Sequence, residues 1–199
     1  DVATLHQVVD DLATDHDWFV LSGSIPAGLS PDIYGKLVAR LKAQDKTVVL
    51  DASGESFRQA IPFAPYAIKP NIDELQELFG QPLESEKAIA QAAQDLLTKG
   101  IQCIAVSMGA KGAIFAEADE VVIVRPPKIE VVSTVGAGDA MVSGLVTGKL
   151  RGLSLSDCAR LATAFSMGAL SQVGPRLPPK ETVESFMNQV TIQNLYKRS

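Results

Sequence analysis

The sequence predicts an α/β fold: a mainly parallel sheet with helices on both faces. Short apolar runs follow one another along the chain with amphipathic stretches between them, and the first runs are continuous rather than alternating. Continuous apolar strands, each followed by a helix, are typical of a parallel sheet that is covered on both sides. The 199 residues are 46% hydrophobic and 21% charged, which is ordinary for a folded domain. We therefore expect residues 1–199 to form a single domain.

The pattern of apolar residues places the elements in order. Strands are expected over residues 17–22, 46–51, 66–69, 101–107, 113–118 and 120–125, the last two joined as a hairpin at Asp119. Helices are expected over residues 31–44, 71–79, 84–99 and 154–171. Asn71 and Gly80 have the residue types of an N-cap and a C-cap for the second of these helices. From Gly138 onward the chain is expected to be mostly helical.

Charge and cysteine content exclude several classes of protein. Lys and Arg number 18 against 23 Asp and Glu, so the formal net charge is -5 and a nucleic-acid partner is not expected. The two cysteines have no C-x-x-C spacing, which argues against a zinc site and a disulfide scaffold. No apolar stretch approaches about 18 residues, so a membrane partner is not expected either. These features favour the reducing cytoplasm.

The motif that carries most chemistry is a small-residue turn that opens into a helix, Gly136-Ala137-Gly138-Asp139. Consecutive backbone amides at the positive end of a helix dipole bind anions, and a carboxylate beside them can accept a proton. Such a site suits phosphoryl transfer to a hydroxyl. The plainer interpretation is a glycine turn in which Asp139 only stabilises the first helical turn. Neither a dinucleotide fingerprint nor a Walker A loop fits these residues.

Residues 132–141, Val-Ser-Thr-Val-Gly-Ala-Gly-Asp-Ala-Met, resemble the second signature of the ribokinase-like sugar kinases of the phosphofructokinase-B branch. The resemblance implies an ATP-dependent carbohydrate kinase with Asp139 as catalytic base and sugar contact, and with Gly136, Ala137 and Gly138 as the anion cradle. It extends over about residues 17–176. It covers the later part of a family member, so we expect the C-terminal, nucleotide-binding part of a larger kinase, without the family's N-terminal strands and lid.

The segment Lys69-Pro-Asn71-Ile-Asp-Glu74 is similar to the family's N-x-x-E element. In the family this Asn and Glu organise magnesium, usually through water, together with the ATP phosphates. The resemblance thus assigns Glu74 and Asn71 to the metal, and Lys69 and Asn71 to ATP. An Asn cap with a glutamate in the first helical turn explains the same spacing structurally.

Two loops resemble the family's remaining motifs. Residues 107–112 are similar to its S-x-G-x-x-G loop, against which ATP lies, although a glycine turn between two strands has the same composition. The ATP contacts implied here are Ser107, Met108, Gly109, Ala110, Lys111 and Gly112, with Gly138 and Asp139 from the cradle. Residues 22–28 resemble an S-G-S-x-P-x-G loop of kinases that act on phosphorylated sugars, which assigns Ser24 to the substrate; an ordinary Ser/Gly/Pro turn is the alternative.

The resemblance is closest to members that convert fructose 1-phosphate to fructose 1,6-bisphosphate with ATP and magnesium. Tagatose 6-phosphate and fructose 6-phosphate are alternative substrates, and a nucleotide-binding fragment without activity is an alternative of another class. A homodimer is also compatible with the family. In some relatives, carbonyls near Ser133, Val135 and residues 174–176 hold a monovalent cation. The small-residue helix 154–171 covers the adenine in the family, but tight helix packing explains it as well.

Overall fold

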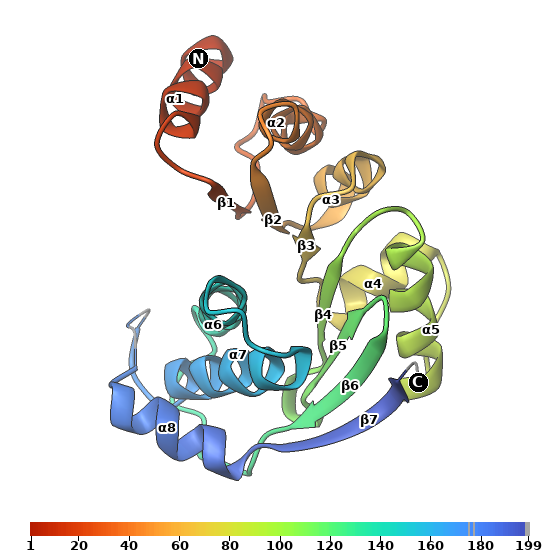
Figure 1. Ribbon diagram of the computed structural model, residues 1–199, viewed down its shortest axis with the longest axis vertical. Helices are drawn as coiled ribbons and strands as arrows, with labels where there is room; N and C mark the ends of the chain where they lie inside the picture. The colour runs from red at the N-terminus through yellow and green to blue at the C-terminus, as the bar shows by residue number, and fades with distance from the viewer. Residues whose placement is uncertain (175, 177, 198–199) are drawn as a thin grey trace.

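The computed structural model describes residues 1–174, 176 and 178–197, and these form a seven-stranded sheet with helices on both sides (Figure 1). The strands lie in the sheet in their order along the chain: β1 (Trp18–Ser22), β2 (Thr47–Asp51), β3 (Ala67–Ile68), β4 (Cys103–Ser107), β5 (Ala113–Glu117), β6 (Glu120–Arg125) and β7 (Thr191–Lys197). The pairings from β1 to β4 are parallel and those from β4 to β7 are antiparallel. The predicted fold class and the hairpin at Asp119 are confirmed.

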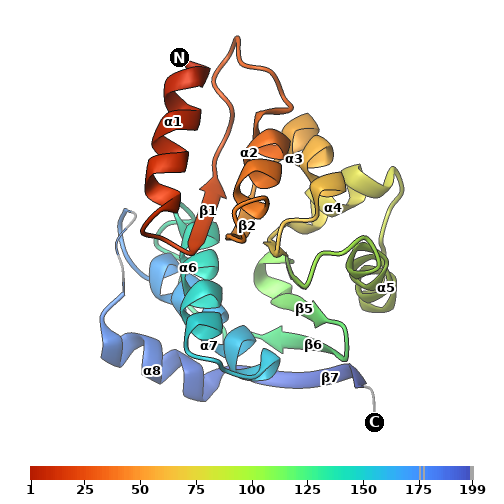
Figure 2. The same ribbon diagram turned by 45° about the horizontal axis from the view of Figure 1, so that its top comes forward.

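The first helix precedes the first strand and the others lie between strands: α1 (Val2–Ala13), α2 (Ile33–Lys42), α3 (Gly54–Ala60), α4 (Ile72–Phe79), α5 (Glu86–Leu97), α6 (Ala137–Leu150), α7 (Leu155–Leu170) and α8 (Lys180–Gln189). Asn71 caps α4 and Gly80 ends it in the left-handed conformation, as predicted. Helix α1 lies beside β1 at one edge of the molecule (Figure 2). None of the described helices combines the length and the apolar character that a membrane crossing requires.

The central strands are buried on both faces, which explains their continuous apolar sequences. Successive residues of a strand point to opposite sides of a sheet. Leu50, Ile68 and Ile104 therefore pack in one cluster with α3, α4 and α5. Their neighbours Val49 and Cys103 pack in a second cluster with α6 and α7. The two layers hold the carboxyl ends of the parallel strands at a common edge.

Close packing between α6 and α7 fixes the helix that carries the Gly136–Asp139 turn. A Cβ on Gly144 would lie 2.6 Å from the Cα of Ala162, and a Cβ on Gly148 would lie 2.7 Å from Cys158 Sγ. At distances this short a side chain at either glycine would force its neighbours to shift, so α6 approaches α7 nearly backbone to backbone. The small residues of α7 serve this packing.

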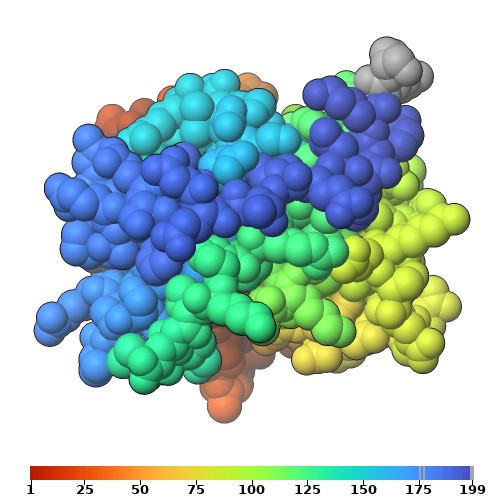
Figure 3. Space-filling model, turned by 90° about the horizontal axis from the view of Figure 1, so that it is seen from below, coloured from red at the N-terminus to blue at the C-terminus, as the bar shows by residue number. Residues whose placement is uncertain are grey.

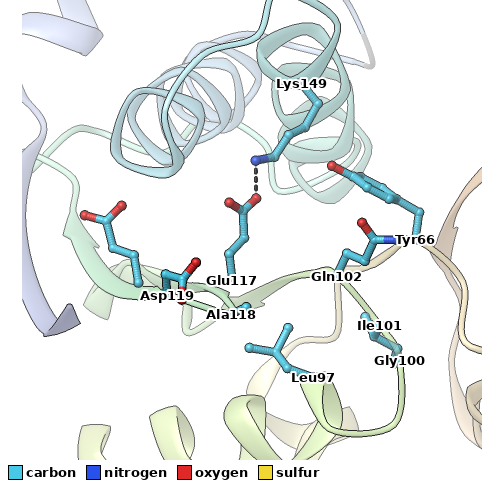
Figure 4. A pocket seen from close by; sticks show the side chains of 10 residues that line it. Tyr66, Leu97, Gly100, Ile101, Gln102, Glu117, Ala118, Asp119 and Lys149 are labelled. Atoms are coloured by element: carbon cyan, nitrogen blue, oxygen red, sulfur yellow. Dashed lines mark hydrogen bonds and ion pairs between the residues drawn. The ribbon is translucent and has the colours of Figure 1, made fainter. Parts of the chain in front are cut away.

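The far end of α6 is anchored at the opposite edge of the sheet (Figure 4). There Lys149 forms an ion pair with Glu117 at the end of β5. The pair lines a cavity of about 550 Å³ together with Tyr66, Leu97 and Gln102. This cavity lies away from the Gly136–Asp139 turn, because it is formed at the other end of α6.

The expectation of a mostly helical chain from Gly138 onward is confirmed by α6, α7 and α8, but the last described segment is a strand that was not predicted. Strand β7 pairs with the free edge of β6, with a register shift between Val121 and Val122. Strand β7 is seen as a dark blue segment when the molecule is viewed from below (Figure 3). Five of its seven residues are exposed, so the sequence lacks the continuous apolar run that marks the other strands. Pairing with an otherwise unpaired edge makes it a strand.

Candidate active site

Three polar residues end neighbouring parallel strands at one edge of the sheet. Ser22 of β1 is paired in register with Asp51 of β2. Lys69 follows β3 directly, and its backbone N–H donates to Leu50 O at 3.2 Å. Because parallel strands end at the same edge, a hydroxyl, a carboxylate and an ammonium group come together there. Ligands of open α/β sheets bind at this edge.

The Gly136–Asp139 turn lies against these strand ends. Gly136 has φ 81°, a conformation that glycine adopts easily, and it is the N-cap of α6. Asp139 is exposed, and its Oδ1 accepts a hydrogen bond from Ser22 Oγ at 3.3 Å. None of the hydrogen bonds within the described chain uses the N–H groups of Gly138 or Asp139. The helix start thus offers free donors beside a carboxylate, as an anion cradle requires.

A buried ion pair lies behind the turn. Lys69 Nζ is 3.1 Å from Asp51 Oδ1, and the two side chains are 7% and 15% exposed. A Cβ on Gly138 would lie 3.4 Å from Lys69 Nζ, so the ammonium group faces the backbone of the cradle. The pKa of Asp51 is raised above its ordinary value, because burial and the nearby charge of Asp139 raise it more than Lys69 lowers it. No role was predicted for Asp51 from the sequence, although its position at the end of an apolar run was a signal.

Asn71 and Glu74 form a complete capping box at the start of α4. Asn71 Oδ1 accepts from the N–H of Glu74 at 2.9 Å, and Glu74 Oε2 accepts from the N–H of Asn71 at 2.8 Å. The interpretation of the N-x-x-E spacing as a helix cap is therefore confirmed. Burial raises the pKa of Glu74, and its hydrogen bond from Asn71 and the charge of Lys69 lower it.

Magnesium bound through water fits these residues. Glu74 uses one carboxylate oxygen for the cap, which leaves the other for a hydrated cation near the cradle. Among the described residues, no three His, Cys, Asp or Glu side chains are grouped closely enough to hold a metal ion directly. A cation at this edge would therefore depend on water and on phosphate oxygens for its other ligands.

The Ser107–Gly112 loop follows β4 and reaches the same edge. Ser107 pairs with Asn71 in an isolated parallel bridge, which brings the loop beside the N-x-x-E element. The N–H of Met108 donates to Gly112 O at 2.8 Å, so the loop closes on itself. Gly112 has φ 96°, and a Cβ there would lie 1.9 Å from Val124 O. Gly109, Ala110 and Lys111 form the exposed tip of this turn.

An apolar cavity of about 430 Å³ extends from this loop to α6 and α7. Its walls include Gly109 and Gly112 of the loop, the chain after β6 at Pro126, and Met141 of α6. Thr134, two residues before Gly136, also lines it. The cavity therefore adjoins the anion cradle, and its volume is in the range of small-ligand sites.

Ser24 lies apart from this group in an exposed loop, where it lines a cavity of about 320 Å³ with Ser53 and Ser56. Ser22, the first residue of the same S-G-S-x-P-x-G segment, is the one that contacts Asp139, although only Ser24 was assigned to the substrate from the sequence. Of the residues expected near a monovalent cation, Ser133 and Val135 precede the cradle, and Pro175 lies outside the described residues.

Comparison with known proteins agrees with this geometry. The model of the pfkB family carbohydrate kinases matches residues 2–182. The chain is 43% identical over 184 residues to the 1-phosphofructokinase of Rhodobacter capsulatus, covering 92% of this chain and 58% of that protein. It is 37% identical over 177 residues to the 1-phosphofructokinase of Escherichia coli K12, covering 89% and 57% respectively.

Solved structures show the same fold. The phosphofructokinase-2 from Escherichia coli in complex with potassium has a TM-score of 0.87 and 27% identity, covering 94% of this chain and 61% of that chain. A complex of that enzyme with substrates and products has a TM-score of 0.85 and 27% identity, covering 92% and 61%. The chain thus spans about three fifths of the length of these relatives. It belongs to the pfkB family of carbohydrate kinases.

Proposed function

We propose that this chain is the nucleotide-binding part of an ATP-dependent 1-phosphofructokinase, which transfers the γ-phosphoryl group of ATP to fructose 1-phosphate. The observation that carries the proposal is the position of Asp139 beside the free amides of α6 and the Lys69 ammonium group. Phosphoryl transfer needs positive charge around the transferred group and a base at the attacking hydroxyl. The edge of the sheet supplies both.

In this proposal each group has one task. The amides of the Gly136–Asp139 turn and Lys69 stabilise the negative charge that develops on the transferred group. Asp139 accepts the proton of the sugar hydroxyl. Asp51 holds Lys69 in place through their ion pair. When bound, magnesium would neutralise phosphate charge, and Glu74 with Asn71 would hold its water shell.

The cavity beside the cradle is assigned to the base of the nucleotide. It is apolar, it adjoins the Ser107–Gly112 loop, and it ends at the turn where the phosphates would lie. In this arrangement the backbone of the loop contacts the nucleotide between its base and its phosphates. The exposed loop of Ser24 is assigned to the phosphorylated sugar.

Fructose 1-phosphate is favoured over fructose 6-phosphate by the degree of similarity. Relatives named 1-phosphofructokinase are 37% to 44% identical to this chain. The solved phosphofructokinase-2 structures from Escherichia coli are 25% to 27% identical to this chain. We therefore rank tagatose 6-phosphate and fructose 6-phosphate below fructose 1-phosphate.

The test is a kinase assay in which ADP release is measured with each of the three sugar phosphates. The highest kcat/KM is expected with fructose 1-phosphate. The Asp139→Asn variant should lose this activity. A clear preference for another of these sugars would refute the substrate assignment. ADP release at equal rates without any sugar would refute the kinase assignment itself.

A nucleotide-binding unit without turnover is the second candidate, and one observation favours it. The loop of Ser24, which is assigned to the phosphorylated sugar, is exposed. A sugar pocket that needs further residues would leave the nucleotide half intact. Thermal stabilisation by ATP without ADP release would support this candidate, and turnover by the 199 residues would exclude it.

The remaining partners follow from the same proposal. A monovalent cation near Ser133 and Val135 is supported by the potassium complex of the Escherichia coli phosphofructokinase-2. Self-association is supported by the tetrameric form in which that enzyme has been solved. The cytoplasm as compartment is supported by two buried cysteines that form no disulfide.

A further inference from the structure

Tyr34 of α2 ties together the two ends of the loop that follows β1. Its hydroxyl oxygen lies 3.0 Å from Ser22 O and 2.9 Å from Gly23 O, so its one proton is donated to a pair of neighbouring carbonyls. The half-buried ring packs against two apolar clusters, one containing Leu50 and one containing Leu37. The hydroxyl therefore has a fixed place from which it holds the end of β1.

Burial of the carbonyls does not require this hydrogen bond. Ser22 and Gly23 are exposed, so water could satisfy both carbonyl groups. A hydrogen bond that replaces one to water adds little net stability. Burial and the charge of Asp51 raise the pKa of Tyr34, so the phenol keeps its proton and remains a donor. What the hydrogen bond adds is a defined position for the backbone.

The end of β1 needs such a support, because it is held from few sides. Strand β1 is at the edge of the sheet and pairs only with β2 among the described strands. Gly23 has φ 102°, and its N–H donates to Asp51 O at 3.1 Å. Residues 24–32 then form neither helix nor strand. Strand β2 thus holds this corner of the backbone from one side and Tyr34 holds it from the other.

The position of this corner decides whether Ser22 reaches the candidate base. Ser22 Oγ lies 3.3 Å from Asp139 Oδ1, which is longer than the usual range of about 2.5–3.0 Å for a hydroxyl donor. A backbone shift of a fraction of an ångström would therefore break the contact. While Oδ1 is engaged by Ser22, the carboxylate can present its second oxygen to a substrate hydroxyl.

We propose that Tyr34 is a positioning residue, which holds the end of β1 so that the Ser22 hydroxyl orients the Asp139 carboxylate for proton acceptance. The inference rests on the proposed function, in which Asp139 is the base. Tyr34→Phe keeps the ring and removes the hydroxyl, so kcat at saturating substrates should fall about three- to tenfold, the effect of one neutral hydrogen bond. The KM for ATP should stay unchanged, because the Ser107–Gly112 loop follows β4, on the other side of β2 and β3.

The experiment is a double-mutant cycle in steady-state kinetics with ATP, magnesium and fructose 1-phosphate. Its variants are Tyr34→Phe, Ser22→Ala and the combination of the two. If Tyr34 acts through the Ser22 hydroxyl, Tyr34→Phe should lower kcat in the parent and change it less than about twofold in the Ser22→Ala background. Tyr66→Phe is the matched control, because it removes the same atom from a half-buried tyrosine at the cavity of Lys149, and it should leave kcat unchanged.

Native-state hydrogen exchange of the free proteins is the second measurement, and it does not depend on turnover. The N–H of Gly23 should exchange about three- to tenfold faster in Tyr34→Phe than in the parent, because its hydrogen bond to Asp51 O would open more often. The N–H of Thr47 donates to Asp17 O at the other end of this strand pair. Its exchange should stay unchanged, so it serves as the internal reference.

The outcomes separate the inference from the proposed function. A normal kcat in Tyr34→Phe, or an equal fall of kcat in the two backgrounds, would overturn the inference and leave the kinase assignment standing. Unchanged exchange of the Gly23 N–H would also overturn it, because Tyr34 would then not hold this corner. A parent protein without ADP release on any of the three sugar phosphates would overturn the proposed function, and the role of Tyr34 in orienting a base with it.

Discussion

Asp139 is an exposed carboxylate, and its hydrogen-bond partner among the described side chains is a neutral hydroxyl, that of Ser22. Lys69 is paired with Asp51 and does not neutralise Asp139 directly. A carboxylate in this setting stays available to accept a proton from a substrate hydroxyl. The two acids at this edge of the sheet therefore differ: Asp51 is buried and paired with Lys69, whereas Asp139 is exposed.

The first prediction concerns Asp139 as base. Asp139→Asn keeps the shape and the amide cradle but removes proton acceptance, so kcat should fall by roughly two to four powers of ten. ATP affinity should change little. The measurement is steady-state kinetics on protein shown to be folded by circular dichroism. Asp73→Asn at the start of α4 is the control, and a turnover within a few-fold of the parent in Asp139→Asn would contradict the assignment.

The second prediction concerns Glu74. Glu74→Gln preserves the capping box, since a glutamine at this position can accept the same backbone hydrogen bond. It removes the negative charge, so the magnesium concentration for half-maximal rate should rise while the KM for the sugar stays nearly constant. Magnesium titrations at fixed substrate check this, with Glu77→Gln as control. A selective rise in the KM for the sugar would count against the metal role.

At the scale of elements, the contact of α6 with α7 gives the third prediction. Gly→Ala in an open helix is stabilising by about 0.5 to 1 kcal/mol. At Gly144 the new Cβ would lie 2.6 Å from the backbone of Ala162, which cannot yield as a side chain does. Overpacking of this kind costs about 1–3 kcal/mol, so the steric effect outweighs the helix propensity.

Gly144→Ala should therefore lower the melting temperature by roughly 2 to 10 °C for a protein of this size. Ser143→Ala, one residue away on the exposed side of α6, is the matched control and should change it little. Thermal unfolding followed by circular dichroism is the measurement. A Gly144→Ala protein as stable as the control would show that the two helices can move apart at no cost.

The elements also show how far the sequence could predict this structure. Buried strands such as β2 and β4 were predicted because both of their faces are apolar. Helix α4 was predicted because Asn71 and Gly80 are residue types that commonly cap helices. Strand β7 was missed, since its conformation depends on pairing with β6 and not on its own pattern. Helix α3 was missed because it has only 7 residues.

The residues of the candidate site also fall into those that a local motif predicts and those that only the tertiary structure places. Asp139, Lys69 and Asn71 lie in local motifs and were predicted from them. Ser22 and Asp51 acquire their places from the register between β1 and β2, which no local pattern specifies. The contact of Tyr34 with the end of β1 depends on three-dimensional packing and leaves no trace in the sequence.

Across the sheet of the whole molecule there is a gradient of burial from the central strands to the two edge strands, and the fourth prediction follows from it. Strands β4, β5 and β6 are almost completely buried, whereas β1 lies at an edge and Val20 is 47% exposed. Local opening requires less free energy where fewer apolar contacts are lost. Native-state hydrogen exchange should find faster exchange in β1 than in β4. Equal protection of the two strands would contradict this gradient.

The hydrogen bond between Ser22 and Asp139 joins residues that are 117 positions apart. During synthesis at about 5–20 residues per second, the ribosome therefore makes Ser22 roughly 6 to 23 s before Asp139. Throughout that interval the growing chain lacks the Gly136–Asp139 turn, so the anion cradle cannot form. Under the proposed function, nucleotide binding therefore stabilises only a chain whose helix α6 has already left the ribosome.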